Sequence, residues 1–410
     1  MPLPARNTLA IVGAGPIGLE AALAGMDRGF DVHLFERGEP GAHPNAWGHV
    51  KMFTPWRMNL GPVSVEHLRR TDWESPDPEA FPTGKQLASD YLEPLARLPE
   101  LKGRLHAQAL VVHVSRQGAL KGDHVSSPER REYPFRLLVR DAGGRENFLH
   151  AFSVIDASGV YGQPNWAGDG GIPARNELYL APQLSYHIDD VCGLRRERYA
   201  GRRTMVIGAG ASAATSALAL AQLAGEVPGT HVVWTTRKPA DQLCREIPND
   251  PLAERRSLMA SARDLVRGRH AAVTHVGGAR VEGLEFNSAT HRYRVTLTVG
   301  EQPRVEEVDH ILVNAGYGPD ISLYRELQVH ECYASRAPMK LAAALLGSGA
   351  SDCLTTPAFG ADVLTNPEPD FYVLGNKSYG RSSNFLLEPG YRQVADVIER
   401  LAKEQQVAVG

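Results

Sequence analysis

Close to its N-terminus the chain reads Leu9-Ala10-Ile11-Val12-Gly13-Ala14-Gly15-Pro16-Ile17-Gly18-Leu19-Glu20. The apolar run before Gly13 predicts a buried parallel strand, and Gly13, Gly15 and Gly18 have the spacing of a dinucleotide-binding fingerprint. In such a fingerprint the first glycine allows a tight turn, the second lets the backbone approach a pyrophosphate, and the third lets helix and strand pack closely. The pyrophosphate would then lie on the N–H groups at the positive end of the helix.

The next residues complete a strand-helix-strand unit. An Ala-rich helix continues to Gly29, and residues 31–36 form the next apolar strand. Glu36 comes 18 residues after Gly18, close to where a carboxylate accepts hydrogen bonds from an adenosine ribose. We therefore expect a cofactor site that includes Pro16, Ile17, Glu36 and Arg37. The alternative is a glycine-rich turn that binds nothing.

Length and composition limit the classes of protein to which this chain can belong. A chain of 410 residues is long enough for two or three domains. Its 44 basic and 47 acidic side chains give a net charge of −3, which does not favour nucleic acid or an anionic membrane as a partner. The sequence has no apolar run of about eighteen residues, and the first strand begins too early to leave room for a signal peptide. We expect a cytoplasmic protein that acts on small molecules.

The cysteines predict neither a metal site nor a redox pair. Cys192, Cys244, Cys332 and Cys353 are widely spaced and form no Cys-x-x-Cys motif. We interpret them as reduced thiols.

A loop and an aromatic segment come after the first unit. Pro and Gly in residues 37–45 predict a loop. Residues 47–59 contain two Trp, a Phe, a His and an Arg without periodicity, which we interpret as the lining of a pocket. In this interpretation Trp56 contacts the cofactor. The alternative is a loop that packs its aromatic residues into the core.

An amphipathic helix is expected from about residue 83 to 95. Residues 108–115, 134–141 and 146–155 then have the alternating or β-branched pattern of a small antiparallel sheet. The segment Phe152-Ser153-Val154-Ile155-Asp156-Ala157-Ser158-Gly159 returns to a buried parallel strand that ends in small residues. Small residues would let a cofactor lie against the backbone.

The chain then repeats this plan. Residues 203–213 form a second strand and fingerprint, whose expected cofactor contacts are Gly208, Gly210, Ala211, Ser212 and Ala213. The strand after its helix ends in Arg237-Lys238, with no acidic residue. Cations pair with a 2′-phosphate that a carboxylate would repel, so the second site should prefer NADP. Two solvated surface cations are the alternative. We expect Ser212 to cap the helix, with or without a contact to the pyrophosphate.

A second antiparallel sheet is expected over residues 280–286, 292–299 and 304–308, and after it a return strand that leads into Asn314-Ala315-Gly316-Tyr317. Residues 370–381 predict a strand and a loop, and residues 390–404 an amphipathic helix. The fold class is therefore α/β, with two Rossmann-like three-layer domains that each carry a small antiparallel sheet. We expect an FAD domain at residues 1–160 and 320–410, and an NADPH domain at 161–319. Hydride transfer requires the two domains to face one another across a cleft.

The motifs together resemble the two-dinucleotide-binding-domain flavoproteins, which include thioredoxin-reductase-like enzymes and several classes of FAD monooxygenase. In that superfamily the segments resembling Asp156–Gly159 and 314–316 mark crossings between domains, and the segment resembling 371–375 approaches the flavin. The resemblance therefore implies cofactor contacts at Gly159, Ala315, Gly316, Gly375, Asn376 and Tyr379.

Departures from the superfamily narrow the choice. The chain lacks the cysteine pair of the disulfide reductases and the spaced His and Trp of the Baeyer–Villiger enzymes, and Asn376 stands where the reductases have Asp. The remaining resemblance is to flavin-containing or N-hydroxylating monooxygenases.

That resemblance implies that NADPH reduces FAD, that O₂ then forms a C4a-(hydro)peroxyflavin, and that one oxygen atom passes to the N, S or carbonyl group of a small organic substrate. The alternative enzyme is an NADPH-dependent reductase that passes electrons to a quinone, a ferredoxin or another acceptor. A third hypothesis is a redox-inactive sensor. The expected partners are substrate and O₂, with a homodimer left open.

Three residues are candidates for catalysis. Arg57 would stabilise negative charge on reduced flavin or hold an anionic substrate, with an ion pair as the alternative. His49 would manage a proton, with a structural role as the alternative. Tyr317 would border the cleft, with core packing as the alternative. Lys377, Tyr379, Arg381 and Asn384 lie in the loop after the last expected strand, where they would contact cofactor or substrate.

Overall fold

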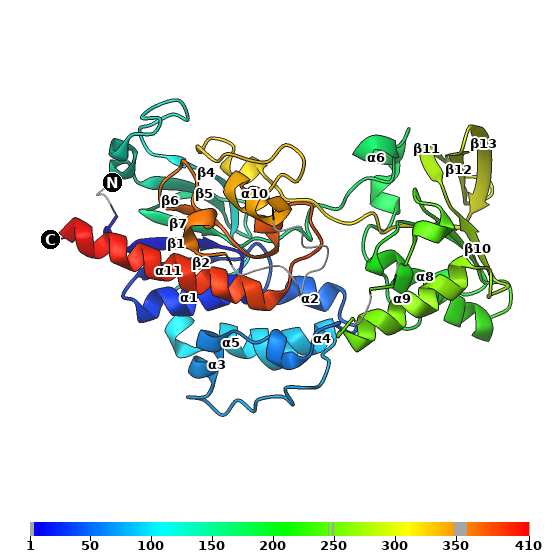
Figure 1. Ribbon diagram of the computed structural model, residues 1–410, viewed down its shortest axis with the longest axis horizontal. Coiled ribbons are helices and arrows are strands. Elements are labelled where there is room, and N and C mark those ends of the chain that lie inside the picture. Colours follow the sequence, from blue (N-terminus) through cyan, green and yellow to red (C-terminus); the bar gives the residue numbers. More distant parts are fainter. Residues whose placement is uncertain (1–3, 245, 248–249, 348–358, 410) are drawn as a thin grey trace. The chain divides into compact units, whose positions relative to one another are not determined.

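The computed structural model describes residues 4–244, 246–247, 250–347 and 359–409. The chain forms two compact units, one of Met1–Gln163 with Gly318–Gly410 (unit 1) and one of Pro164–Tyr317 (unit 2) (Figure 1). In the described ranges, no helix is both long enough and apolar enough to cross a membrane. Cys353 lies outside these ranges, and Cys192, Cys244 and Cys332 are free thiols.

A parallel five-stranded sheet forms the centre of unit 1, in the order β15-β7-β1-β2-β3. An antiparallel sheet of β4, β5 and β6 covers one of its faces. The strands of this unit are β1 (Thr8–Val12), β2 (Asp31–Phe35), β3 (Leu105–His106), β4 (Leu110–Arg116), β5 (Phe135–Arg140), β6 (Glu146–Ala151), β7 (Ser153–Asp156) and β15 (Phe371–Val373).

Alternate residues of β1 point to opposite faces of this sheet. Leu9 and Ile11 join a core cluster with helix residues, whereas Ala10 and Val12 join a cluster with the antiparallel sheet. A strand buried on both faces is a near-continuous apolar run, as residues 9–12 are here. The helices of the unit are α1 (Pro16–Asp27), α2 (Ala42–Ala46), α3 (Pro62–Leu68), α4 (Gly84–Leu87), α5 (Glu93–Ala96), α10 (Met339–Gly347) and α11 (Leu387–Val409).

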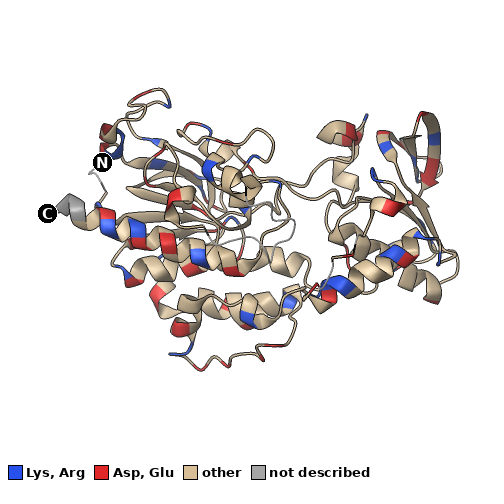
Figure 2. Cartoon of the chain, in the orientation of Figure 1, with Lys and Arg blue, Asp and Glu red and all other residues tan. Residues whose placement is uncertain are grey.

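The long helix α11 packs on α1 through an apolar stripe that includes Val394, Val397 and Ile398. Acidic and basic residues are interspersed along this helix (Figure 2). Arg392 pairs with Glu388 and Lys403 with Glu399, each one helical turn apart. The expected amphipathic helix is therefore confirmed, with an earlier start and a later end than predicted.

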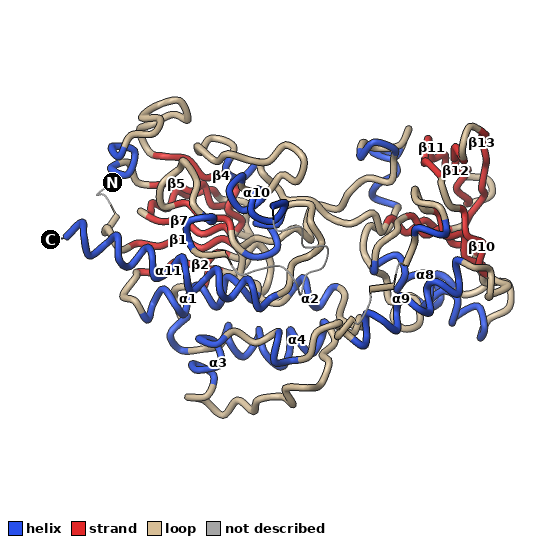
Figure 3. The backbone as a smooth tube through the Cα atoms, in the orientation of Figure 1, coloured by secondary structure: helices blue, strands red, loops and turns tan. Residues whose placement is uncertain are grey.

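Unit 2 repeats the same architecture (Figure 3). Its parallel sheet has the order β10-β9-β8-β14, and β11, β12 and β13 form the antiparallel sheet. Val206 of β8 faces a cluster with helix residues, and Met205 faces a cluster with the antiparallel sheet. The elements are α6 (Glu177–Leu180), α7 (Arg196–Tyr199), β8 (Arg203–Ile207), α8 (Ala211–Glu226), β9 (His231–Thr235), α9 (Ala253–Val266), β10 (Val273–Val276), β11 (Ala279–Asn287), β12 (Arg292–Val299), β13 (Gln302–Val308) and β14 (His310–Val313).

Both expected strand-helix-strand units and both antiparallel sheets are confirmed, and with them the α/β fold class. The prediction that residues 37–45 form only a loop was wrong, because α2 begins at Ala42. Pro44 is the third residue of this helix, where its missing N–H costs no intrahelical hydrogen bond.

Candidate nucleotide-binding sites

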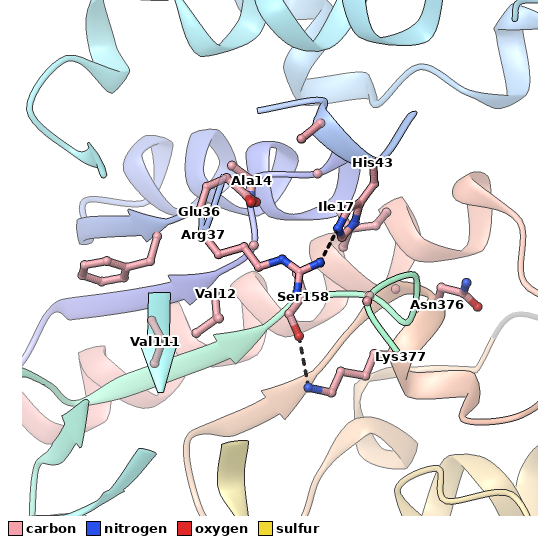
Figure 4. Close-up of a pocket in the computed structure, with 18 of the residues that line it drawn as sticks. Val12, Ala14, Ile17, Glu36, Arg37, His43, Val111, Ser158, Asn376 and Lys377 are labelled. Atoms are coloured by element: carbon pink, nitrogen blue, oxygen red, sulfur yellow. Dashed lines mark hydrogen bonds between the residues drawn. The ribbon is translucent and has the colours of Figure 1, made fainter. Parts of the chain in front are cut away.

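A pocket of about 350 Å³ lies at the carboxyl ends of the parallel strands of unit 1 (Figure 4). Ligands of open parallel sheets bind at this edge, where the strand order switches between neighbouring strands. Residues shortly after each strand end contribute to the lining: Gly13 and Gly15 after β1, Glu36 after β2, Ala157 and Ser158 after β7, and Gly375, Asn376 and Lys377 after β15. A volume of this size is typical of cofactor pockets.

The three glycines of the first fingerprint have different surroundings. Gly13 has a φ of +99°, and a Cβ atom on it would lie 2.7 Å from the carbonyl oxygen of Ala157. A Cβ on Gly18 would lie 1.7 Å from the carbonyl oxygen of Gly13, so only glycine lets α1 approach β1 this closely. A Cβ on Gly15 would meet none of the described residues within 4 Å. The backbone at Gly15 therefore borders open space in the pocket.

The N-terminus of α1 is open toward the pocket. Gly15 is the N-cap, no side chain caps the helix, and Pro16 and Ile17 of the first turn line the pocket. Backbone N–H groups at such an end favour an anion.

Glu36 lies at the end of β2 and lines the pocket, as its place in the sequence suggested. Its Oε2 accepts a hydrogen bond from the N–H of Ala14 and its Oε1 accepts one from Gly38, both at 2.9 Å. These bonds fix the carboxylate against the fingerprint, and each oxygen retains a second lone pair. Arg37 donates from Nη2 to Nε2 of His43 at 2.7 Å, and both residues line the pocket (Figure 4).

Asp320 also lines the pocket, close to the start of the second segment of unit 1. Burial alone would raise the pKa of its carboxyl group. Hydrogen bonds from the side chain and backbone of Ser322 and the charge of Lys377 outweigh burial and hold this pKa below its ordinary value. Asp320 is therefore an anion at neutral pH.

The second fingerprint has the same geometry in unit 2. Gly208 has a φ of +144°, and a Cβ on it would lie 2.1 Å from the carbonyl oxygen of Asn314. A Cβ on Gly210 would meet none of the described residues within 4 Å. Ala213 is fully buried against the strand, in the third small position.

The prediction that Ser212 caps α8 was wrong. Gly210 is the N-cap residue without a side-chain cap, Ala211 is the first residue of the helix and Ser212 the second. A side chain caps from the N-cap position, which lies two residues earlier. The first turn of α8 is therefore as open as that of α1.

Arg237 and Lys238 come after β9, and both are exposed. Within the described part of the chain, neither has a carboxylate partner at ion-pair distance. The Thr236 hydroxyl donates to the carbonyl oxygen of Lys238 at 2.7 Å, which fixes this turn. Two exposed cations thus follow the strand that corresponds to β2 of unit 1.

Two linker segments join the units in sequence. In unit 2 the N–H of Asn165 donates to the carbonyl oxygen of Gly316 at 2.9 Å, and its side chain donates to Ala315 at 3.2 Å. The Tyr317 hydroxyl lies 3.0 Å from Nδ1 of His187, and the two rings are stacked 5.7 Å apart. Burial lowers the pKa of His187. In unit 1, Gly159 has a φ of +70° and lines the pocket.

Other predicted site residues lie outside the lining of this pocket. Arg57 is exposed and pairs with Glu79 through Nε at 2.8 Å. His49 is exposed. Trp56 and Tyr379 are buried at 3% exposure in the core of unit 1. The catalytic roles of Arg57, His49 and Tyr317 stay predictions.

Sequence reasoning missed two features of the pocket. It gave no role to Asp320, whose position after a return strand was the available signal. It also did not pair Lys377 with Asp156, which lie 221 residues apart in the chain. No spacing rule reports such a contact. Among the described residues, no group of three or more His, Cys, Asp or Glu is arranged to hold a metal ion.

The chain was compared with known proteins. No protein-family model and no curated sequence matches it. Solved structures do match. The bacillithiol disulfide reductase Bdr from Bacillus cereus has a TM-score of 0.70 at 18% identity, over 97% of this chain and 99% of that one. The cadaverine monooxygenase DfoA of the desferrioxamine pathway from Erwinia amylovora, solved with FAD, has a TM-score of 0.64 at 13% identity, over 97% and 94%.

The ornithine N-hydroxylase KtzI from Kutzneria sp. 744, solved with reduced FAD, NADP⁺ and L-ornithine, has a TM-score of 0.59 at 17% identity, over 98% of this chain and all of that one. Reductases and N-hydroxylating monooxygenases thus share one architecture with this chain. At these identities the likeness shows the fold, and the chain has the fold of the two-dinucleotide-binding-domain flavoproteins.

Proposed function

We propose that this protein is a flavoprotein oxidoreductase that binds FAD in unit 1 and NADPH in unit 2. The observation that carries the proposal is the duplicated fingerprint. In both units the first and third small residues of the fingerprint pack closely against neighbouring atoms. The middle residue, Gly15 or Gly210, instead borders open space before a helix that no side chain caps. This arrangement suits a pyrophosphate.

The two units differ after their second parallel strand, where unit 1 has the carboxylate of Glu36 before Arg37 and unit 2 has Thr236 before two cations. In unit 1 the carboxylate of Glu36 lines the pocket and suits the hydroxyl groups of an adenosine ribose. In unit 2 Arg237 and Lys238 suit a 2′-phosphate. We therefore assign FAD to residues 1–160 and 320–410, and NADPH to 161–319.

FAD, when bound, supplies the capacity to accept a hydride and to pass electrons on. The residues of this chain bind and orient it. The first turn of α1 holds the pyrophosphate, Glu36 holds the ribose, and the loops after β7 and β15 border the remainder of the pocket. In unit 2 the first turn of α8, with Ser212, and the two cations of the β9 turn hold the nicotinamide nucleotide.

The finer proposal is an NADPH- and O₂-dependent monooxygenase that acts on a small organic substrate. It is supported by the sequence motifs, by the absence of a Cys-x-x-Cys pair in the whole sequence, and by a fold shared with DfoA and KtzI. The alternative is an NADPH-dependent reductase that uses another electron acceptor, and the fold shared with Bdr is compatible with it.

The test begins with FAD reconstitution and continues with NADPH oxidation under air and under argon with a panel of amines, thioethers and ketones. A monooxygenase consumes O₂ with NADPH, is stimulated by its substrate and yields an oxygenated product. NADPH oxidation under argon that requires an added quinone or ferredoxin would identify the reductase instead. Protein that stays colourless with excess FAD would overturn the whole proposal.

A further inference from the structure

A buried ion pair has one of its members, Lys377, in the lining of the unit 1 pocket. Lys377, in the turn after β15, is 1% exposed, and Asp156, the last residue of β7, is fully buried. Nζ of Lys377 donates to Oδ2 of Asp156 at 2.6 Å. A pair of charges this deeply buried gains little net stability, because desolvation offsets their attraction. Stability alone therefore does not explain why this pair lies beside a ligand pocket, and a role in ligand binding is the alternative.

One of the three N–H donors of the Lys377 ammonium group has no hydrogen-bond partner among the described residues. An ammonium group has three N–H donors. One goes to Asp156, and a second goes to the hydroxyl of Ser158 at 3.0 Å (Figure 4). The Ser158 hydroxyl in turn donates to Oδ1 of Asp156 at 2.6 Å. Nζ donates to no third acceptor within the described ranges. The ring of Tyr324, 5.3 Å away, supports the charge without accepting a hydrogen bond of normal length.

A second buried pair in the same unit provides a contrast. Arg116 and Glu368 are both buried, with Nε 2.7 Å from Oε1, and Glu368 also pairs with the buried Arg130, whose Nη2 lies 2.8 Å from Oε2. The other guanidinium nitrogens of Arg116 donate to the carbonyl oxygens of Tyr133 and Pro369, so each nitrogen has an acceptor within the protein. Neither residue lines the pocket. This pair therefore has the contacts of a purely structural one, whereas Lys377 and Ser158 line the pocket.

We propose that Lys377 contacts the dinucleotide bound in unit 1, donating its remaining N–H to an oxygen atom of FAD, while Asp156 balances its charge. This inference rests on the proposed function. From the sequence we expected Arg57 to stabilise negative charge on reduced flavin, but Arg57 is exposed and paired with Glu79. We assign this role to Lys377 instead, because its side chain lines the pocket. A charge next to the cofactor acts on its electronic properties as well as on its binding.

The experiment is a double-mutant cycle with Lys377→Met, Asp156→Asn and the double variant. Three quantities are measured for each protein: the urea midpoint without FAD, the dissociation constant for FAD, and the midpoint potential of the bound flavin. Lys377→Met alone leaves a buried carboxylate without its partner and should lower the urea midpoint. The double variant removes both charges and should recover most of that loss.

The inference predicts that the cofactor effects do not recover with stability. Loss of one charge-assisted hydrogen bond should weaken FAD binding roughly 10- to 100-fold in the double variant. Its midpoint potential should be lower than in the wild type, and that of Asp156→Asn, where Lys377 keeps an unbalanced charge, should be higher. Arg116→Met, which removes a buried cation outside the pocket and leaves Glu368 paired with Arg130, is the control, with an unchanged flavin potential.

The outcomes separate the two proposals. A wild-type protein that binds no FAD overturns the proposed function, and this inference with it. A wild-type protein that binds FAD, with a double variant of equal FAD affinity and equal potential, overturns the inference alone. The Lys377–Asp156 pair would then be structural, like the pair of Arg116 and Glu368.

Discussion

Glu20 is a carboxylate of helix α1 with 1% exposure, two residues after the last glycine of the fingerprint. It accepts hydrogen bonds from the backbone N–H groups of Val63 and Ser64, at 2.9 and 2.8 Å, and from the Ser64 hydroxyl. These two N–H groups belong to the first turn of α3, which no side chain of its own caps. Glu20 thus caps a neighbouring helix from inside the core.

We expect Glu20→Ala to lower the free energy of unfolding by roughly 2–4 kcal/mol, because it leaves buried donors without an acceptor. Urea unfolding monitored by circular dichroism measures the change. Glu66→Gln is the control, since Glu66 is exposed and pairs with the exposed Arg70, and such pairs contribute less than about 1 kcal/mol. Equal losses in the two variants would contradict the assigned role of Glu20.

The carboxyl group of Asp370 makes the free energy of unfolding depend on pH. Burial raises the pKa of its carboxyl group from 3.8 to about 6; the charge of Arg131 opposes this shift and the nearby Glu404 carboxylate adds to it. The folded protein therefore binds a proton more tightly here than the unfolded chain does. Ionising Asp370 costs folding energy, so its unfavourable contribution is absent below about pH 3.8 and fully present above about pH 6.

We expect Asp370→Asn to stabilise the protein at pH 8, by up to about 3 kcal/mol, and to change stability little at pH 4. Asparagine also tolerates the φ of +60° at this position. Urea unfolding at both pH values measures the difference, with Asp241→Asn on the exposed surface of unit 2 as control. A stabilisation that is the same at both pH values would contradict the raised pKa.

At the scale of single residues, the sequence predicted positions better than contacts. Gly13, Gly15, Gly18 and Glu36 all line or support the pocket because their order along one strand-helix-strand unit fixes where they lie. The partner of Lys377 was not predictable, because it comes from a strand far away in the sequence. The exposure of Arg57 was not predictable either, since a segment without periodicity gives no facing direction.

At the scale of elements, the two fingerprint units have different requirements at each glycine. The helix α1 can approach β1 only because Gly18 has no Cβ, whereas Gly15 has an extended backbone, with φ −81° and ψ −173°, that any residue adopts. The fold therefore depends on Gly18, and the space for a ligand depends on Gly15.

We expect Gly15→Ala to leave the free energy of unfolding within about 0.5 kcal/mol of the wild type and to weaken FAD binding at least about tenfold. Gly18→Ala should instead cost about 3 kcal/mol or more, since its Cβ would overlap a carbonyl oxygen. Urea unfolding and fluorescence titration with FAD measure the two effects. Wild-type affinity in Gly15→Ala would contradict a pyrophosphate at this turn.

Element boundaries were predictable wherever the pattern was apolar. The strands β1, β2, β8 and β9 lie within one or two residues of their expected ends. The helix α9 and the strand β10 were missed. In α9 the residues fully or nearly buried are confined to its C-terminal half, at Ala262, Leu265 and Val266, and its charged residues hide the helical period. Such an element is fixed by its packing on α8, which a single sequence does not report.

At the scale of the whole molecule, the duplicated plan predicts that the two nucleotides can be weakened independently. Arg237 and Lys238 belong to unit 2, whereas the residues that line the unit 1 pocket all belong to unit 1. Substitution of the exposed cations should not alter the core of either unit, because neither side chain is buried.

We expect Arg237→Ala with Lys238→Ala to raise the KM for NADPH roughly 10- to 100-fold, because charge-assisted hydrogen bonds to a 2′-phosphate are lost. The KM for NADH, which has no such phosphate, should stay within about twofold, and so should the dissociation constant for FAD. Steady-state kinetics with both nucleotides and FAD titration measure these values. An equal rise for NADPH and NADH would mean that the cations act on a part common to both nucleotides. A change in FAD affinity would mean that the two sites are coupled despite lying in separate units.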